Sequence, residues 1–398
     1  MNDYRAGRII EALRSGIPSR EVGYCFSSAR PGIMREMQDA LEHLAENRQS
    51  GGRILSGKYG EGKTHLLNTV FNMAQERNMA VSTVTLSKES PLSSLHTLYP
   101  KILQNTYLPK QVQPGISVVL EQLSSGHPIV ASLLEYCLTR LGVNKLYYVL
   151  KAYLGTQDDE EKYLLLGDLE GNFMANTTLR QIYRRIYGEP AIFNVAFAKS
   201  RHLQDYFAFL SHLFLLFGYD GWVLLFDEAE LIGRLGRKSR LKAYLNMDEF
   251  LRPARTEASH CIFAFNASYT PDVIEAKHEH ARLDDAQLTE AERERVEATL
   301  AEIASATQLL PLNREETMEI VEKICQYHGQ AYGWQPNLNV EELLSAVEKH
   351  GYLLRTRIRT VVEMLDQLYQ YGETDDIRIN ELSRVTFEEE DASLDAFV

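Results

Sequence analysis

Three glycines, a lysine and a threonine lie within one short stretch, in an order that suits phosphate binding. Residues 57–64 fit the pattern G-x-x-x-x-G-K-[ST]. Glycine permits backbone conformations in which N–H groups converge on phosphate oxygens, Lys63 supplies a positive charge for the β- and γ-phosphates, and the Thr64 hydroxyl suits Mg²⁺. The pattern therefore predicts a nucleoside triphosphate as ligand. The residues expected to bind it are Gly57, Lys58, Tyr59, Gly60, Glu61, Gly62, Lys63, Thr64 and His65.

Two acidic residues at the end of an apolar run supply groups that cleavage of a triphosphate would need. The run Trp222–Phe226 indicates a buried central strand, which would deliver Asp227 and Glu228 to the carboxyl edge of a parallel sheet. There Asp227 would hold Mg²⁺, usually through water, and Glu228 would act as the general base that polarises the attacking water. Together with Lys63, these residues predict a hydrolase.

Asn266 ends the next buried run, Cys261–Phe265. From a neighbouring strand, its amide would reach the γ-phosphate or the attacking water, which makes it a candidate catalytic residue. Asparagine also favours caps and turns, so capping of the following segment is the alternative.

The elements expected around these residues form an α/β fold with a parallel central sheet. Apolar and β-branched segments predict strands at residues 53–56, 80–86, 222–226, 261–265 and 308–312. Apolar residues at helical spacing predict a helix directly after the phosphate-binding loop. Strand, glycine-rich loop and helix are the setting in which such a loop binds phosphate, because the amino end of the helix also favours anions.

The segment from residue 87 to about 200 shows helical patterns and no convincing strand. A connection of that length far exceeds an ordinary crossover of a few residues and one helix. We therefore expect a large helical insertion in the core. Its many tyrosines are expected to pack inside it, with a partner-binding surface as the alternative.

Helical patterns also occupy both ends of the chain. Before the loop, helices are expected at residues 4–13 and 32–46, and Ile17 and Pro18 between them are candidate walls of an adenine pocket. A plain docking helix and turn is the alternative for that segment. Two capping-box pairs, Thr289 with Glu292 and Asn313 with Glu316, predict helix starts. After Asn313, helices are expected at 315–327, 340–348 and 356–371.

Composition excludes some classes of function. The net charge of −13 argues against a protein coated with basic surface for nucleic acid. The four cysteines are scattered and lack the spacing of a zinc or redox motif. The sequence shows neither a signal peptide nor an uncharged apolar run of membrane-spanning length, so we expect a soluble, cytoplasmic protein without a membrane partner.

A basic cluster follows the two acids and leaves a local DNA contact open. Its positive charges could bind the phosphates of DNA. The alternative is a solvated loop on an acidic protein. Its members are Arg234, Arg237, Lys238, Arg240 and Lys242.

The order of these parts resembles that of AAA+ ATPases: a P-loop, an Asp-Glu strand end, an asparagine on the next strand and a trailing helical lid. Three stretches resemble the BREX-type ATP-binding proteins of bacterial phage defence more closely. They are Arg8–Pro18, Tyr59–Leu67, and Gly218–Trp222 leading into Asp227–Glu230. The resemblance covers most of the chain and is patchy across the insertion. It implies ATP and Mg²⁺ as cofactors.

The resemblance also implies arginines at the active site. The lid should bring a second-sensor arginine at the start of its last helix, where Arg355 stands, although Leu354 replaces the proline of the family pattern. A finger arginine from a neighbouring subunit is expected between Asn266 and Leu309. Arg282 is our choice, because acids around the alternatives Arg293 and Arg295 favour pairing along an exposed helix.

The predicted architecture is an AAA+-type P-loop fold in three parts: a helical segment at 1–50 that contributes to the nucleotide pocket, an ATPase core at 51–312 with the insertion at about 87–200, and a helical lid and tail at 313–398. The predicted function is that of a homo-oligomeric ATPase that acts as a switch or remodeller beside other defence proteins, such as a helicase or nuclease. The alternatives are an ATP-dependent oligomeric scaffold with little turnover and a DNA-stimulated motor subunit.

Overall fold

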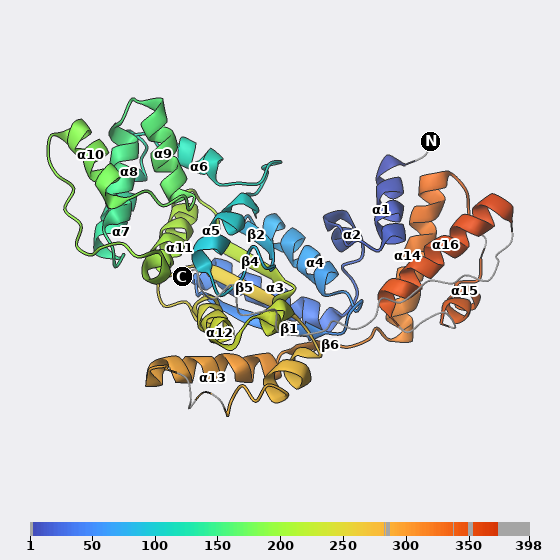
Figure 1. Ribbon diagram of the computed structural model, residues 1–398. Helices are drawn as coiled ribbons and strands as arrows, with labels where there is room; N and C mark the ends of the chain where they lie inside the picture. Colours follow the sequence, from blue (N-terminus) through green and yellow to red (C-terminus); the bar gives the residue numbers. More distant parts are fainter. Residues whose placement is uncertain (1–2, 282, 284–286, 337, 349–352, 373–398) are drawn as a thin grey trace.

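The structure is a computed structural model, and it describes residues 3–281, 283, 287–336, 338–348 and 353–372. A six-stranded sheet in the order β3-β2-β4-β5-β1-β6 lies at its centre, with helices on both faces (Figure 1). All neighbouring strands run parallel except β3, which is antiparallel to β2. The predicted α/β fold with a largely parallel sheet is confirmed. The strands are β1 (Gly51–Gly57), β2 (Ala80–Thr85), β3 (Thr106–Tyr107), β4 (Trp222–Asp227), β5 (Ser259–Asn266) and β6 (Thr307–Leu309).

Each face of the sheet packs against its own set of helices. On one face, α3 (Pro31–Asn47) and α4 (Lys63–Glu76) cover Val223 and Leu225 of β4. On the other face, Trp222, Leu224 and Phe226 join the core formed with α5 (Leu95–Gln104), α11 (Lys199–Leu216), α12 (Arg237–Leu251) and α13 (Glu290–Ala304). Because side chains alternate along a strand, the next odd-numbered residue, Asp227, lies on the α4 face.

The segment between β2 and β4 is largely helical, as the sequence indicates, but the expectation that it lacks a strand is wrong at β3. This two-residue strand extends the sheet beside Val81 and Ser82. The helices after it are α6 (Ser117–Glu121), α7 (Val130–Thr139), α8 (Lys145–Gly155), α9 (Asp159–Leu169) and α10 (Asn176–Tyr187). Their buried residues belong to the same hydrophobic cluster as the sheet face beneath them. The insertion and the sheet therefore share one continuous core.

Most insertion tyrosines pack in that core, in line with the first interpretation. Tyr99, Tyr136 and Tyr183 are buried, whereas Tyr163 is 75% exposed. A buried ion pair also lies here, with Lys145 Nζ 2.6 Å from Asp168 Oδ2. Tyr206 donates a second hydrogen bond to the same carboxylate.

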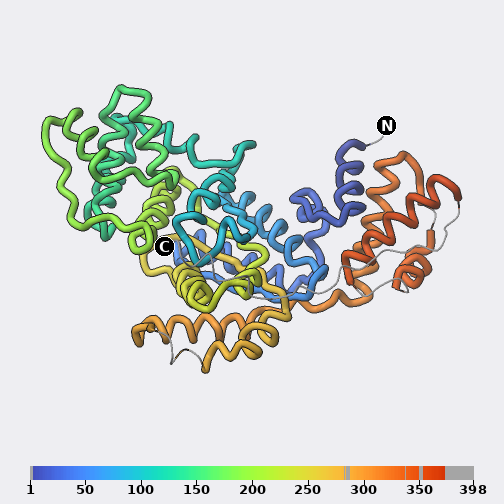
Figure 2. The backbone as a smooth tube through the Cα atoms, viewed as in Figure 1, coloured from blue at the N-terminus to red at the C-terminus, as the bar shows by residue number. Residues whose placement is uncertain are grey.

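The first helix packs with the last helices rather than with the sheet (Figure 2). Residues of α1 (Tyr4–Ser15) share a hydrophobic core with α14 (Arg314–Tyr332), α15 (Val340–Val347) and α16 (Leu354–Tyr371). Arg14 donates to both carboxylate oxygens of Asp366 on α16, at 2.7 and 2.9 Å. We call α1 and α14–α16 the helical body. The helix α2 (Arg20–Cys25) was not predicted from the sequence. It packs between the helical body and α4.

Two local predictions have clear outcomes. The capping boxes of Thr289 with Glu292 and of Asn313 with Glu316 are both present, at the starts of α13 and α14. The basic cluster after β4 does not form one exposed loop. Arg240 lies on α12, fully buried, and its guanidinium pairs with Glu279 at 2.7 Å. A buried and paired guanidinium is unavailable to DNA phosphates.

Among the described residues, no helix is long and apolar enough to cross a membrane.

Candidate functional site

The phosphate-binding loop connects β1 to α4 at the carboxyl edge of the sheet. Gly60 and Gly62 have φ values of +80° and +95°, conformations that residues with a Cβ rarely adopt. The first turn of α4 leaves backbone N–H groups without helical partners, which makes it suited to anions. Lys63 begins this helix, and its Nζ lies 3.0 Å from the carbonyl oxygen of Gly57. The ammonium therefore sits directly over the end of β1.

Thr64 and Asp227 meet across 163 residues of sequence. The Thr64 hydroxyl donates to Asp227 Oδ2 at 2.6 Å, because α4 begins above the end of β4 and Asp227 points to the α4 face. A hydroxyl and a carboxylate in contact beside a phosphate-binding loop are oxygen ligands of the kind that Mg²⁺ prefers. These residues fit the metal that the sequence implies.

Glu228 lines the same cavity as the loop, and its backbone is strained. Its φ of +58° lies in the left-handed region, which is uncommon for a residue with a side chain. Its N–H donates to Asp227 Oδ1 at 2.9 Å, which fixes the turn after the strand. Burial, and secondarily the charge of Asp227, raise the pKa of the Glu228 carboxyl. A carboxyl with a raised pKa is better matched to accepting a proton near neutral pH.

Asn266 lies at the end of β5, directly opposite Gly57 of β1. Its Oδ1 accepts the N–H of Ser268 at 3.0 Å, which stabilises the turn directly after the strand. The residue is 7% exposed, at the strand edge that also carries the loop. Its backbone N–H donates to the carboxylate of Glu230 at 3.1 Å.

Glu230 was not singled out as a site residue, although it belongs to the Asp227–Glu230 stretch. It is 2% exposed, and burial raises its pKa to about 7. No ion pair is formed by Glu230 within the described part of the chain. The positive charge of Lys63 is the largest of the effects that lower this pKa. The carboxyl of Glu230 therefore lies within electrostatic reach of the loop. The signal for Glu230 in the sequence is its position two residues after the adjacent acids Asp227 and Glu228.

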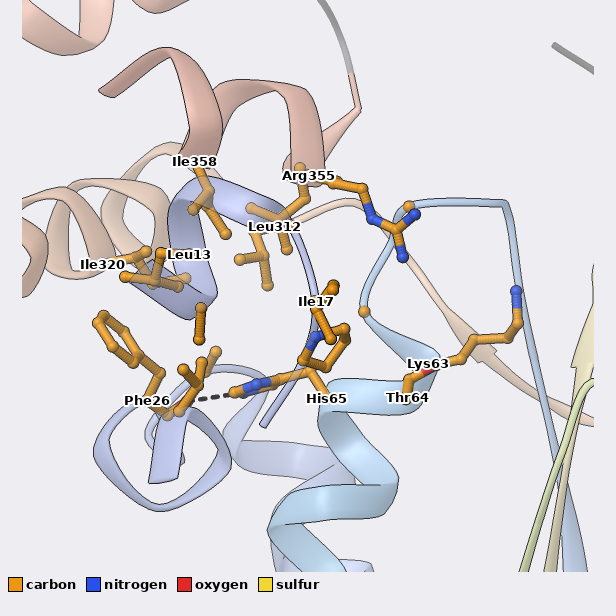
Figure 3. A pocket seen from close by; sticks show the side chains of 18 of the residues that line it. Leu13, Ile17, Phe26, Lys63, Thr64, His65, Leu312, Ile320, Arg355 and Ile358 are labelled. Carbon is orange, nitrogen blue, oxygen red and sulfur yellow. Dashed lines mark hydrogen bonds between the residues drawn. The ribbon is translucent and has the colours of Figure 1, made fainter. Parts of the chain in front are cut away.

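An apolar cavity adjoins the loop on the side of the helical body (Figure 3). Ile17 and Pro18 line it, as expected for walls of a base pocket. Leu13 of α1, Phe26 and Ile320 of α14 line it as well, so its walls come from both ends of the chain. His65 also faces it and contacts the Phe26 carbonyl oxygen at 3.2 Å, and burial lowers the pKa of its imidazole. Glycines 60 and 62, Lys63, Thr64 and Glu228 line the other side.

Arg355 reaches the loop from the start of α16. Its guanidinium donates to the Tyr59 hydroxyl at 2.8 Å and lies 5.0 Å from the centre of the Tyr59 ring. Its backbone N–H donates to the Gly60 carbonyl oxygen at 3.3 Å. A Cβ on Gly60 would meet Leu353 and Arg355 at ordinary contact distances of 3.5 to 3.7 Å, so the positive φ, and not a lack of space, favours glycine at this position.

Arg30 is a second residue that the sequence analysis missed. It lines the apolar cavity, and its guanidinium donates to the carbonyl oxygens of Glu61 and Leu310 at 2.8 and 3.0 Å. Its N–H donates to Glu316 of α14 at 3.1 Å. Arg30 therefore joins the loop, the connection after β6 and the helical body. Glu61 is 31 residues away in sequence, and Leu310 and Glu316 are 280 and 286 residues away, so no local pattern marks Arg30.

The remaining predicted residues lie apart from this cavity or cannot be placed. Gly57 and Lys58 supply carbonyl oxygens to Lys63. Arg295 is paired, but with Asp248 and Glu249 on α12 and not along its own helix as expected. Arg282, the predicted finger, lies outside the described residues.

Comparison with known proteins confirms the resemblance seen in the motifs. A family model described as "BREX system ATP-binding protein BrxC/D" matches residues 2–125 and 146–383, which is most of the chain. Among solved structures, a Walker-type ATPase of Pyrococcus abyssi matches with 13% sequence identity and a TM-score of 0.35, covering 85% of this chain and 67% of that chain. Comparison with curated proteins gives no match.

Proposed function

This chain belongs to the family of BREX system ATP-binding proteins, and we propose that it binds ATP with Mg²⁺ and hydrolyses it as an AAA+-like ATPase. In this proposal it acts as a switch or remodeller within a bacterial anti-phage defence assembly. The observation that carries the proposal is the 2.6 Å contact between Thr64 and Asp227 at the edge of a cavity that also holds Lys63 and Glu228. A phosphate loop, two metal ligands and a carboxyl base then serve one triphosphate.

The lining of the cavity suggests how ATP would lie. The adenine would fill the apolar end between Ile17, Pro18 and Phe26, where flat apolar rings bury well. The phosphates would follow the loop toward Lys63 and Thr64, with the β- and γ-phosphates at the ammonium of Lys63. His65 would help to close the base end through its contact with Phe26.

Hydrolysis would depend on the carboxyl groups at the end of β4. Mg²⁺, held by Thr64 and Asp227, would supply charge neutralisation for the phosphate oxygens when bound. Glu228 would take a proton from the attacking water, and its raised pKa supports that role. Asn266 would orient the water or the γ-phosphate through its amide. Glu230 would act through Asn266, as a positioning residue that fixes the end of β5.

The helical body would serve as the lid over the nucleotide, with Arg355 as the second sensor. Support comes from its contacts with the loop at Tyr59 and Gly60. The division into a 1–50 segment, a 51–312 core and a 313–398 lid stays part of the proposal, with α1 working together with the lid because the two share a core. Arg282 of a neighbouring copy would complete the site in a homo-oligomer, as the AAA+ resemblance implies.

Steady-state ATP hydrolysis, measured with and without single- and double-stranded DNA, tests this function. Turnover without DNA supports the switch or remodeller. Strong stimulation by DNA supports the motor subunit, and binding without turnover supports the scaffold. The proposal would be overturned if neither the parent protein nor the Lys63→Ala variant bound ATP.

A further inference from the structure

A second cavity begins at Thr64 and Asp227 and leads away from the apolar one. It has a volume of about 440 Å³ and lies between α4, the carboxyl half of β2 and α5. Alternation along β2 explains its polar lining, because Thr83 and Thr85 share the α4 face with Val81. The register of the sheet sets Thr85 directly beside Asp227. The cavity is therefore continuous with the metal end of the proposed ATP site.

Several hydrogen-bonding groups in this cavity have no protein partner. Among the described residues, the side chains of Thr83, Thr85, Ser90 and Lys101 make no hydrogen bond or ion pair with one another or with the rest of the chain. Ser90 is only 6% exposed. Its hydroxyl oxygen remains accessible from the cavity, and the side chains of Thr85 and Lys101 are exposed, so these groups can bond to a solute that enters the cavity. The cavity is large enough for several waters or for one small oxyanion with waters.

We propose that this cavity binds inorganic phosphate and is the site that receives the cleaved γ-phosphate while ADP stays in the apolar cavity. The inference rests on the proposed ATPase function, because that reaction produces the phosphate. Three hydroxyl donors and the Lys101 ammonium match the oxygens of a phosphate ion, which accepts hydrogen bonds on every side.

Charge favours this occupant over a neutral one. Lys101 is the one cation among the described lining residues, and it acts electrostatically on the nearby Glu89 rather than in a close ion pair. Asp227 is the one carboxylate that lines the cavity. Because Asp227 would serve as a metal ligand, bound Mg²⁺ would offset its repulsion of an anion. The anion would then lie between Lys101 and the end of the cavity formed by Thr64 and Asp227.

Titration calorimetry of inorganic phosphate into the protein saturated with Mg·ADP tests the proposal. We expect the parent protein to bind phosphate, and Lys101→Ala to weaken this binding about tenfold or more, since a hydrogen bond from a charged group is lost. Ser90→Ala should weaken it by a smaller factor. Lys88→Ala is the matched control, because Lys88 lies on the same connection but lines a different cavity, and it should bind phosphate as the parent does.

Phosphate inhibition of steady-state ATP hydrolysis gives a second readout, and it should weaken by the same factor in Lys101→Ala. A parent protein that binds Mg·ADP but no phosphate would overturn the inference and leave the ATPase function standing. Equal phosphate binding by the parent, Lys101→Ala and Ser90→Ala would also overturn it, because the ion would then sit elsewhere. A parent that binds neither Mg·ADP nor Mg·ATP would overturn the proposed function and, with it, this site.

Discussion

Replacing Glu230 by glutamine should stabilise the protein above neutral pH and have little effect in acid. The side chain is 2% exposed, and one carboxylate oxygen accepts the N–H of Asn266 at 3.1 Å. Glutamine keeps an oxygen that can accept this bond and removes the charge. The groups that act on the carboxyl are Lys63, which favours the charged form, and Asp227 and Glu228, which oppose it.

The size and sign of the effect follow from the pKa of this carboxyl. Burial raises that pKa from 4.5 to about 7, and at about 1.36 kcal/mol per pH unit this corresponds to about 3 kcal/mol. Below pH 4.5 the carboxyl is protonated in both the folded and the unfolded protein, so its contribution is fully present. Between pH 4.5 and 7 the unfolded chain releases the proton first, and the free energy of unfolding falls as pH rises. Above pH 7 the folded protein must hold a buried charge, and the whole contribution is lost.

Urea unfolding at pH 5 and pH 8 measures this difference. From pH 5 to pH 8, the parent should lose up to about 3 kcal/mol more unfolding free energy than Glu230→Gln. Glu275→Gln replaces an exposed carboxyl and serves as the control, which should follow the parent. Equal pH dependence in the parent and in Glu230→Gln would refute the reasoning, because it would mean that the carboxyl carries no unpaired charge in the folded state.

Three further outcomes are expected. Lys63→Ala should abolish ATP binding, while Glu228→Gln should keep binding and lower turnover by about 10²–10⁴-fold, as equilibrium binding and single-turnover assays would show; parental turnover by Glu228→Gln would contradict the assignment of the base. Lys145→Ala should destabilise the protein by about 3–5 kcal/mol in denaturant titration, because Asp168 would remain buried without its counter-ion, whereas the exposed Lys199→Ala should have little effect. Deleting residues 87–200 should abolish cooperative thermal unfolding, because Leu98, Tyr99 and Ile102 of α5 are fully buried against the sheet; a well-folded deletion protein would show that the insertion is separable.

The sequence predicted the parts of the site that local chemistry determines. The loop needs glycines and a lysine at fixed spacing, so a short pattern finds it and the helix after it. An apolar run that ends in acids marks β4, and alternation along the strand is enough to direct Asp227 toward α4. The two capping boxes followed from pairs three residues apart for the same reason. In each case the interacting groups are neighbours in sequence or share one element.

Contacts between distant segments escaped sequence analysis. Arg30 donates hydrogen bonds to Leu310 and Glu316, which are 280 and 286 residues away in sequence. A single arginine before a helix does not predict partners at that separation. Arg240 was grouped with exposed basic residues, but its partner Glu279 comes from beyond the next strand. β3 has only two residues and forms because β2 offers an unpaired edge beside it. A periodicity argument needs a longer segment than that.

The placement of α1 has the largest consequence for function. Because α1 shares its core with α14–α16, the apolar cavity has walls from the helical body on one side and the loop on the other. A nucleotide in that cavity would contact both, with its base on Leu13 and Ile320 and its phosphates on Lys63. A ligand shifts a conformational equilibrium only by its difference in affinity for the two arrangements. Contacts with two separately packed bodies create such a difference, since moving the helical body away would remove the base contacts and the approach of Arg355 together. ATP binding and hydrolysis would then set the position of the helical body on the sheet, which is the property that a switch requires.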